Sequence, residues 1–455
     1  MPQQSINPAT GETVHEYDEL TSQEARKVIR AADRAQRAWR ESTFAERARP
    51  MRRAAQLLRE RSDDLARLMA SEMGKLLKDG RSEAEKCAWV CEYYAEHAEQ
   101  FLASEEVETD ARTSLIAYQP LGVIFAIMPW NFPLWQVFRF AAPALMAGNT
   151  GVLKHAENVP GCAMAIESII RDAGFPDDVF RSLLINRKQA GLVIRNPLVR
   201  AVTLTGSTAA GKDVAKKSGA VLKKTVLELG GSDPYVVLPD ADLEKTVEAC
   251  VTSRMINAGQ SCIAAKRFVV VEALREQFEQ LMVERMRRFT MGNPFDDRVT
   301  LGPMARRDLR DGLHRQVEQS IAKGAKCLLG GTVPDGNGAF YPPTVLSGVA
   351  KGMPAYDEEL FGPVAAVIPV QNERQALKVA NDSPYGLGAA VFTKDLEKGQ
   401  RIATEILDAG ACFVNAFVKS DPRLPFGGIK ESGYGRELSH VGIKEFVNIK
   451  TVYVA

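Results

Sequence analysis

The sequence has few of the features that mark secreted, membrane-spanning or metal-binding proteins. Among its 455 residues, the seven cysteines never form a CxxC pair and the five histidines never form an HExxH motif. Scattered cysteines of this kind predict reduced thiols, and we expect neither a disulfide framework nor a metal site. No apolar run reaches the ~20 residues of a membrane-spanning helix, and the N-terminal MPQQSINPATGETV is unlike a secretory signal. A cytoplasmic protein without a membrane contact is therefore expected.

The charge balance also lacks an excess of either sign. Lys and Arg total 58 against 57 Asp and Glu, which leaves a formal charge of +1. Nucleic-acid-binding proteins usually carry a basic excess that neutralises phosphates, so no nucleic-acid partner is expected. The remaining composition, with 45% hydrophobic and 25% charged residues, is that of a globular protein. Its length predicts about two to four domains, with room for a cleft between them.

The first quarter of the chain is predicted to be helical. Residues 21–110 are rich in Ala, Arg, Glu and Leu, with apolar residues at helical spacing. Ser22 can cap a helix that runs to Arg40, and residues 44–73 continue the pattern. We expect these segments to be surface helices that pack on a separate core.

From residue 121 onward, short Val- and Ile-rich runs alternate with helical segments. The alternation indicates βαβ units and a mostly parallel, doubly wound sheet, and it starts again after residue 231. The predicted fold class is therefore α/β, with two such domains in succession. The candidate strands cover residues 122–128, 151–154, 180–185, 201–205 and 225–229 in the first domain, and 235–238, 268–271, 364–370, 389–392 and 411–415 in the second.

Two further segments, 105–119 and 446–454, alternate as half-buried strands do but lie outside this rhythm. Such peripheral strands are suited to edge pairing between subunits. The pattern fits equally well if the two segments are additional strands at the edge of the monomer's own sheet.

Cys262 is the one cysteine predicted to face a cleft. It ends the small, polar stretch NAGQSC, which follows a helical segment over residues 243–255. Backbone N–H groups around the thiol would favour a nucleophilic thiolate. The alternative is a small buried hydrophobic residue, which most lone cysteines are.

Glu228 is unusual because it ends an apolar strand and lies two residues before the first of two consecutive glycines. Ligands bind at strand ends in open α/β sheets. Partial desolvation there would raise the pKa of the carboxyl and make it a general base near neutral pH. A glutamate that caps a turn or pairs with a lysine is the competing interpretation.

Asn131 lies in the loop PWNFP at residues 129–133, directly after a strand. Two prolines and two aromatic residues hold its amide stiffly, and a fixed N–H donor is what an oxyanion requires. An asparagine that only supports its own turn is the alternative.

The stretch GSTAAG at residues 206–211 follows a strand and opens a helix, as a phosphate-binding turn does. Thr208 replaces the second glycine of the usual dinucleotide motif, so an ordinary βα turn fits as well. Lys154 and Glu157 lie at and after the end of another strand, where they could bind ribose hydroxyls or remain solvated loop charges.

Taken together, these motifs resemble the aldehyde dehydrogenase superfamily over nearly the whole chain. Six motifs occur in the order of that family: PWNFP at 129–133, TGS at 205–207, LELGG at 227–231, GQSC at 259–262, EELFGP at 358–363, and PFGG at 425–428 followed by SG at 432–433. Within the family, the chain is most similar to short bacterial succinate-semialdehyde dehydrogenases. The segments that carry this closer similarity are WQVFR at 135–139, KHA at 154–156 and KSDPRLP at 419–425.

The resemblance implies a fold of three parts. Residues 1–101 and 121–229 would form the NAD(P)-binding domain, and residues 230–428 the catalytic domain. Residues 102–120 and 429–455 would form the oligomerisation arm of a homodimer or homotetramer.

The resemblance also implies a mechanism. Cys262 would attack the aldehyde carbon, and the Asn131 amide and the Cys262 backbone N–H would hold the oxyanion. Glu228 would activate the water that hydrolyses the thioester. The residues implied to bind the nicotinamide cofactor are Trp130, Lys154, Glu157, Gly206, Ser207, Leu229, Glu359 and Phe361.

Glu157 bears on the choice of cofactor. A carboxylate there can accept both hydroxyls of an adenosine ribose and would repel a 2′-phosphate. We therefore expect NAD to be preferred. NADP is possible because Lys154 and His155 could partly compensate for that repulsion.

The expected substrate is succinate semialdehyde, in the context of 4-aminobutyrate degradation. Arg139 lies eight residues after Asn131, a little over two helical turns, and can face the same tunnel. Its guanidinium, with Ser420 and Trp135, would bind the distal carboxylate. Related enzymes carry a second arginine six residues before the cysteine, where this chain has Ile256. A broader range, including glutarate semialdehyde and medium aliphatic or aromatic aldehydes, is therefore left open.

Two rival interpretations are considered. A CoA-acylating enzyme would pass the thioester to coenzyme A, but the base Glu228 favours hydrolysis. A binding or structural protein that has kept only the fold is disfavoured, because Asn131, Glu228, Cys262 and Glu359 are all present.

Overall fold

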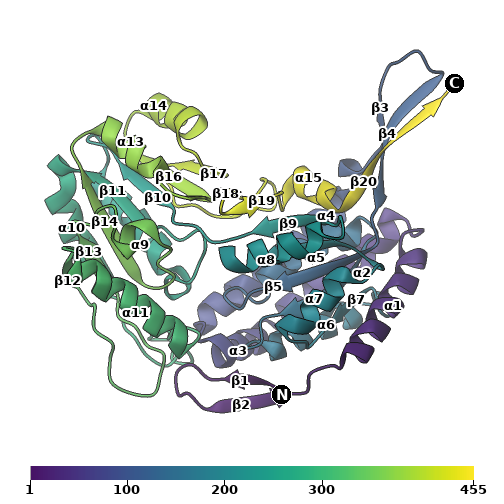
Figure 1. Cartoon of the computed structure of the whole chain (residues 1–455), viewed down its shortest axis with the longest axis horizontal. Coiled ribbons are helices and arrows are strands. Elements are labelled where there is room, and N and C mark those ends of the chain that lie inside the picture. The colour runs from purple at the N-terminus through teal and green to yellow at the C-terminus, as the bar shows by residue number, and fades with distance from the viewer. Residues whose placement is uncertain (1) are drawn as a thin grey trace.

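Two largely parallel sheets organise the chain, in a computed structural model that describes residues 2–455. The six-stranded sheet has the order β19-β9-β8-β5-β6-β7, and the seven-stranded sheet has the order β12-β13-β14-β11-β10-β16-β17. Figure 1 shows two α/β halves, one around each sheet, which meet at the centre of the molecule. The predicted α/β fold class is confirmed.

In the six-stranded sheet, the Val- and Ile-rich runs form the central strands because both of their faces are covered by helices. Ile124 and Ala126 pack toward one face and Val123 and Phe125 toward the other, in two separate hydrophobic clusters. The strands are β5 (Val123–Met128), β6 (Thr150–His155), β7 (Phe180–Ser182), β8 (Val199–Thr205), β9 (Lys224–Glu228) and the antiparallel β19 (Gly433–Tyr434).

The helices of this half fall into two groups. One face of the sheet carries α1 (Ser22–Trp39), α7 (Arg187–Arg195) and α8 (Thr208–Gly219). The other carries α2 (Phe44–Glu60), α3 (Ser62–Met73), α4 (Leu77–Phe101), α5 (Trp135–Met146) and α6 (Pro160–Asp172).

The N-terminal helices differ from the sequence prediction in two respects. Thr21, and not Ser22, caps α1, because the Thr21 hydroxyl accepts from the Glu24 N–H while the Glu24 carboxylate accepts from the Thr21 N–H. In addition, α4 is more than a surface helix. Cys87 and Cys91 are fully buried in it, and α4 packs against α2, α3 and α5.

The seven-stranded sheet is built in the same way, with one antiparallel pair at its edge. Its strands are β10 (Pro234–Val237), β11 (Arg267–Val271), β12 (Lys326–Leu329), β13 (Thr344–Ser347), β14 (Val364–Val370), β16 (Gly388–Phe392) and β17 (Ala411–Val414). Its helices are α9 (Leu243–Met255), α10 (Glu272–Met286), α11 (Arg307–Ala322), α12 (Pro354–Asp357), α13 (Glu373–Asn381) and α14 (Leu396–Arg401).

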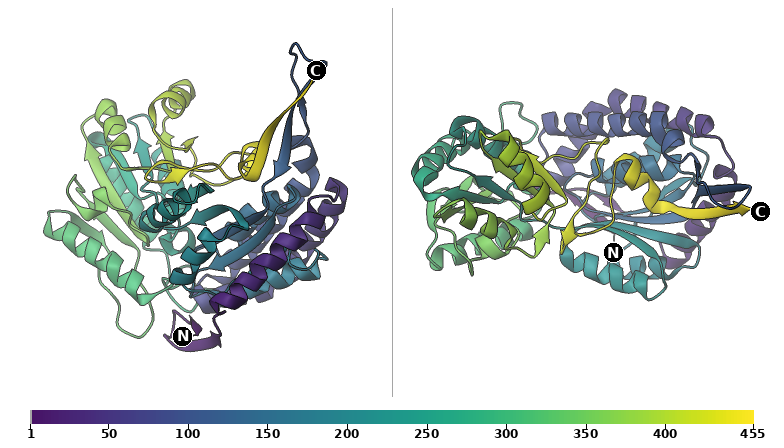
Figure 2. Two further views of the ribbon diagram at one scale, coloured as in Figure 1. Left: turned by 45° about the vertical axis from the view of Figure 1, so that its right-hand side comes forward. Right: turned by 90° about the horizontal axis from the view of Figure 1, so that it is seen from above.

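A third, antiparallel sheet projects from the body of the molecule in both Figure 1 and Figure 2. It contains β3 (Glu105–Glu106), β4 (Thr113–Pro120) and β20 (Val447–Val454), in the order β20-β4-β3. Of the C-terminal segment 429–455, β20 alone joins this sheet, whereas β19 pairs with β9 and α15 (Ser439–Gly442) lies between them.

Two small antiparallel strand pairs complete the structure: β1 (Gln3–Ile6) with β2 (Thr13–Tyr17), and β15 (Tyr385–Gly386) with β18 (Ile429–Lys430). Across residues 2–455, none of the helices combines the length and the apolar character needed to cross a membrane.

Candidate active site

A cavity of about 250 Å³ lies beside Cys262, where the two halves of the chain meet. Its walls come from α4, α5, the end of α9, the loop that carries Cys262, and the segment 417–426. Cys262 and its neighbours Ser261 and Ile263 are part of this wall. The predicted position of Cys262 at a cleft therefore agrees with the structure.

The backbone before Cys262 is held in an uncommon conformation. Asn257, Ala258 and Gly259 are consecutive residues with φ of +54°, +54° and +73°. A left-handed conformation at a residue other than glycine costs about 1–3 kcal/mol, so the surroundings must stabilise it. The Asn257 amide donates to the carbonyls of Asn131 at 2.7 Å and Gln260 at 3.1 Å. These bonds tie the cysteine loop to the loop of the predicted oxyanion donor.

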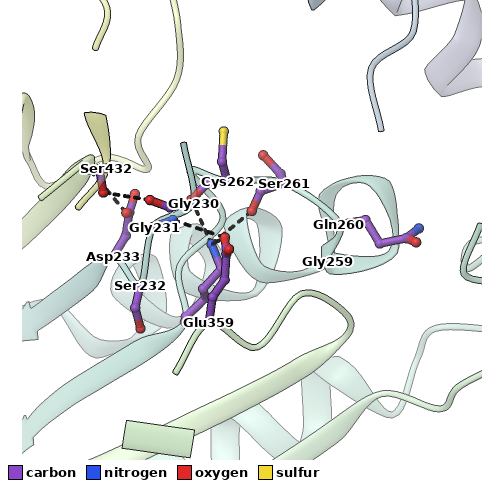
Figure 3. A network of polar contacts seen from close by, with 12 residues as sticks. Gly230, Gly231, Ser232, Asp233, Gly259, Gln260, Ser261, Cys262, Glu359 and Ser432 are labelled. Carbon is purple, nitrogen blue, oxygen red and sulfur yellow. Dashed lines mark hydrogen bonds and ion pairs between the residues drawn. The ribbon is translucent and has the colours of Figure 1, made fainter. Parts of the chain in front are cut away.

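The Cys262 thiol is protonated in the resting structure. Burial raises the pKa of the thiol to about 12, although Arg139 and Lys266 lower it in part. The thiolate expected from the sequence is therefore not the resting form, because desolvation outweighs the neighbouring positive charges. Figure 3 shows the sulfur pointing away from the Glu359 carboxylate and clear of the polar network around it.

Glu228, the last residue of β9, is the second buried titratable group. Its side chain is 2% exposed, and neither carboxylate oxygen has a hydrogen-bond partner among residues 2–455. Burial raises the pKa of this carboxyl well above its usual value, and nearby Glu437 raises it further. Gly427 makes room for it, since a Cβ there would lie 2.7 Å from Glu228 Oε1. The predicted rise in the pKa of Glu228 is confirmed.

The Asn131 amide is fixed at both ends. Its Nδ2 donates to the Gln260 carbonyl at 3.1 Å, and its Oδ1 accepts from Gln136 Nε2 at 3.2 Å. An amide nitrogen carries two hydrogens, so the second N–H of Asn131 can donate to another acceptor. Asn131 is 4% exposed, which limits competition from water.

A buried ion pair supports this loop and was missed in the sequence. Lys75 pairs with Glu83, and both side chains are almost fully buried. Glu83 Oε1 accepts from the N–H groups of Leu134 at 2.8 Å and Trp135 at 3.0 Å, while Lys75 Nζ donates to the Asn131 carbonyl at 3.0 Å. Charged residues in a helical pattern normally indicate a solvent-facing side, so the sequence carries no signal for this pair.

Glu359, which is predicted to bind the cofactor, lies in a polar network next to the Gly230–Gly231 turn. Glu359 accepts from the Gly231 N–H at 3.1 Å and pairs with Lys266 at 3.3 Å. Figure 3 shows Glu359 directly against the Gly230–Gly231 backbone, and a Cβ on Gly230 would collide with its carboxylate. Phe361 and Trp130, also predicted to bind the cofactor, contact each other edge to face with ring centroids 5.8 Å apart.

The turn after β8 leaves the start of α8 open. Ser207 caps this helix by accepting from the Ala210 N–H, and Gly206 donates to the Glu228 carbonyl. Leu229 packs against Gly211, where a Cβ would collide with the leucine side chain. A helix start of this kind attracts a phosphate.

Lys154 and Glu157 form an ion pair at 3.4 Å, with the Glu157 side chain 51% exposed. His155 is turned inward, in contrast to the expectation that it could compensate for Glu157. Its Nε2 lies 2.8 Å from the Pro133 carbonyl, and its Nδ1 accepts from the Ala156 N–H at 2.9 Å. Burial lowers the pKa of His155 to about 4, so the ring is neutral and unable to bind a phosphate.

Arg139 lines the cavity, together with Trp135, Ile256 and Ser420. Its guanidinium is already paired with the buried Glu437, a residue that the sequence prediction missed. Arg254 lies away from the cavity, where it is fully buried and donates to a backbone carbonyl.

The chain is similar to proteins of known function. Residues 2–452 match the sequence model of the Aldehyde dehydrogenase family. A probable NADP(+) succinate-semialdehyde dehydrogenase of Synechocystis sp. is 50% identical over 451 residues, which cover 99% of both chains. The NAD(P)+ succinate semialdehyde dehydrogenase of Escherichia coli K12 is 46% identical, over 99% of this chain and 97% of the relative.

Solved structures agree with these similarities. The succinic semialdehyde dehydrogenase of Streptococcus pyogenes, solved in complex with NADP+, superposes with a TM-score of 0.97. It is 38% identical to this chain, and the superposition covers 99% of each.

Proposed function

Because the chain belongs to the aldehyde dehydrogenase family, we propose that it oxidises succinate semialdehyde to succinate with a nicotinamide cofactor as the hydride acceptor. The observation that carries this proposal is the position of Cys262. The thiol opens on a cavity that Arg139 and Ser420 also line, so one site offers a nucleophile and groups that bind a carboxylate.

In the first step, the Cys262 sulfur bonds to the aldehyde carbon while the thiol proton passes to the ionised Glu228 carboxylate, which releases that proton to solvent before the hydrolysis step. A base is needed because the pKa of the thiol is about 12. The carbonyl oxygen becomes an oxyanion, which the Asn131 amide and the Cys262 backbone N–H hold. The second N–H of the fixed Asn131 side chain is the donor in this arrangement.

In the second step, the carbon–hydrogen bond breaks and a thioester forms on Cys262. A bound nicotinamide cofactor would accept the hydride at this point. Glu228 then takes a proton from water and the resulting hydroxide bonds to the thioester carbon. The carbon–sulfur bond breaks, and Glu228 returns its proton to the departing Cys262 sulfur, which releases the acid and restores the thiol. Because Glu228 is a buried base, it favours water over coenzyme A as the acceptor of the acyl group.

Residues around the cofactor cleft fit a dinucleotide. The start of α8 at Gly206 and Ser207 suits a phosphate, and Leu229 would border it. Glu359, whose carboxylate accepts from the Gly231 N–H, would bind the nicotinamide ribose. The aromatic pair of Trp130 and Phe361 would border the nicotinamide side. Lys154 and Glu157 would bind the adenosine ribose.

For this chain we propose that NAD is preferred over NADP. Glu157 would meet a 2′-phosphate with a like charge, and Lys154 is already paired with Glu157. His155, being neutral and turned inward, does not offset that repulsion. Two relatives are named for NADP(+) or NAD(P)+ use, so both cofactors belong in the assay.

We further propose the three-part division expected from the sequence, with a cofactor domain of residues 1–101 and 121–229 and a catalytic domain of residues 230–428. In the arm, β4 and β20 would pair subunits into a homodimer or homotetramer. Seven free thiols fit a reducing compartment, which favours the cytoplasm.

The test is NADH or NADPH formation with succinate semialdehyde, glutarate semialdehyde, butanal and benzaldehyde, each with both cofactors. Succinate semialdehyde should have the highest kcat/KM, and Cys262→Ala should be inactive. If butanal or benzaldehyde reacts equally well, the proposed substrate is wrong. A rate that depends on added coenzyme A would instead support the acylating reaction.

A further inference from the structure

Lys86 is a cation in the wall of the substrate cavity that has no carboxylate partner. It lies on α4, its Nζ donates to Ser420 Oγ at 2.8 Å, and it stands 4.3 Å from the centre of the Trp135 ring. Within the part of the chain that the structure describes, no ion pair involves Lys86. A partly buried ammonium without a counter-ion is unfavourable.

The other cations that line the cavity are either paired with a carboxylate or exposed to solvent. Lys75 is neutralised by Glu83, and Arg139 by Glu437. Lys419 is exposed to solvent at the cavity mouth. Lys86 is therefore the one cation within the cavity wall whose charge is uncompensated.

We propose that Lys86 and Ser420 bind the distal carboxylate of the aldehyde substrate, with Lys86 supplying the charge that Arg139 shares with Glu437. This inference rests on the proposed oxidation of an anionic aldehyde. Lys86 takes the role left open by Ile256, the cavity residue at which related enzymes carry a second arginine.

The local chemistry fits a carboxylate. Ser420 Oγ accepts from Lys86, so the hydroxyl hydrogen of Ser420 remains free to donate to an anion. The Trp135 ring face stabilises the ammonium and shields it from water on one side. A bound carboxylate would accept one hydrogen bond from each of Lys86 and Ser420, and both would be stronger for being charge-assisted.

The surroundings of Lys86 also predict a pH effect. Burial and the positive charge of Arg139 lower the pKa of Lys86 to about 8, whereas Glu83, Cys87 and Asp421 act in the opposite direction. Glu83 and Asp421 are themselves paired, with Lys75 and Arg423. As the pH rises through about 8, Lys86 loses its charge and the KM for an anionic aldehyde should rise.

The experiment compares Lys86→Met, Lys86→Arg and the control Lys419→Met, with succinate semialdehyde and butanal as substrates of equal carbon number. Lys86→Met should raise the KM for succinate semialdehyde by about 10- to 100-fold, as expected for the loss of a hydrogen bond to a charged group. Its kcat/KM for butanal should stay near that of the wild type, which also reports an intact fold. Lys86→Arg should restore most of the affinity, and Lys419→Met should have little effect.

The rise of KM with pH should disappear in Lys86→Met and be absent for butanal in every variant. Equal losses with both substrates, or an unchanged KM for succinate semialdehyde, would overturn the role of Lys86. If the wild type itself does not prefer succinate semialdehyde to butanal, then the proposed substrate fails first. The wild-type comparison thus separates the two failures.

Discussion

At the scale of single residues, the site depends on two buried acids, the Cys262 thiol and the Glu228 carboxyl, whose charged forms are disfavoured. Cys262 and Glu228 both have raised pKa values, and burial is the main cause for each. The Glu228 carboxyl lacks a hydrogen-bond partner within residues 2–455, so its charged form is disfavoured in the folded state. A base of this kind is reactive when it ionises, but it reduces stability.

Replacing Glu228 with glutamine should therefore separate activity from stability. We expect kcat to fall by about 10²- to 10⁴-fold, the contribution of a general base, and the acidic limb of the pH–rate profile to be lost. In the wild type, this limb reflects a carboxyl that is neutral, and so inactive, below its raised pKa. Steady-state kinetics from pH 5 to 10 would measure both effects.

The same variant should be at least as stable as the wild type at neutral pH. A carboxyl whose pKa is raised by folding binds more protons in the folded state, so stability falls as pH rises from the unfolded pKa to the folded pKa. Glu228→Gln removes that loss, and the two proteins should converge near pH 4. Melting temperatures across pH would test this, and a less stable variant at pH 8 would contradict it.

Glu157 gives a prediction for cofactor choice. Glu157→Ser removes the charge that is proposed to face the adenosine ribose and leaves Lys154 unpaired. The ratio of kcat/KM for NADP to that for NAD should rise by about tenfold or more, the size of one charge–charge contact near a surface. His155→Ala should leave this ratio unchanged, because its ring is buried and neutral. A fall in NADP use by Glu157→Ser would be incompatible with the proposal.

At the scale of elements, the ion pair of Lys75 and Glu83 connects α4 to the start of α5 and to the Asn131 loop. Removing one partner leaves the other charge buried and unpaired. Glu83→Gln should therefore lower the free energy of unfolding by about 3–5 kcal/mol. It should also reduce kcat, because the loop of Asn131, the proposed oxyanion donor, loses its support. Urea denaturation and steady-state kinetics would measure the two losses.

The matched control is Glu85→Gln on the same helix. Glu85 pairs with Arg59 at the surface, where the two side chains are 59% and 38% exposed. Glu85→Gln should lower the free energy of unfolding by at most about 1 kcal/mol and leave kcat unchanged. Similar losses in both variants would mean that the buried pair has no special role.

Much of this could be predicted from the sequence, for physical reasons that differ between elements. The runs that became β5, β8, β10 and β14 were predicted because buried parallel strands require continuous Val and Ile. The strand β13 (Thr344–Ser347) was missed because its run holds only two apolar residues, Val345 and Leu346, between two prolines and a glycine. The family itself was predicted correctly from six short motifs.

The interior polar contacts could not be predicted in the same way. The sequence shows Glu83, Lys86 and Glu437 as charges in helical or loop segments, and such charges are usually solvated. Their burial depends on how α4, α5 and the C-terminal segment pack together, which no local pattern records. The inward orientation of His155 could not be predicted for the same reason, since its Nε2 partner, the Pro133 carbonyl, lies 22 residues away.

At the scale of the whole molecule, the sheet of β20, β4 and β3 extends beyond the rest of the chain (Figure 2). Its outer strand β20 leaves Ile449 60% and Tyr453 55% exposed. An apolar strand with an open edge is suited to pairing with another subunit.

The variant Ile449→Lys with Tyr453→Lys should therefore shift the protein toward monomers, because charge on an edge strand opposes pairing. Light scattering after size-exclusion chromatography would measure the mass. Leu396→Lys, a similarly exposed position on α14, is the control and should leave the mass unchanged. An unaltered oligomer in the double variant would place the subunit contact elsewhere.

The protonated form of Cys262, the proposed nucleophile, affects how readily oxidants and alkylating agents react with the resting protein. Peroxides and alkylating agents attack thiolates far more readily than thiols. With a pKa of about 12, Cys262 is almost wholly protonated at neutral pH in the resting protein. We therefore expect the resting protein to react slowly with peroxides and alkylating agents, because burial keeps the Cys262 sulfur protonated between turnovers.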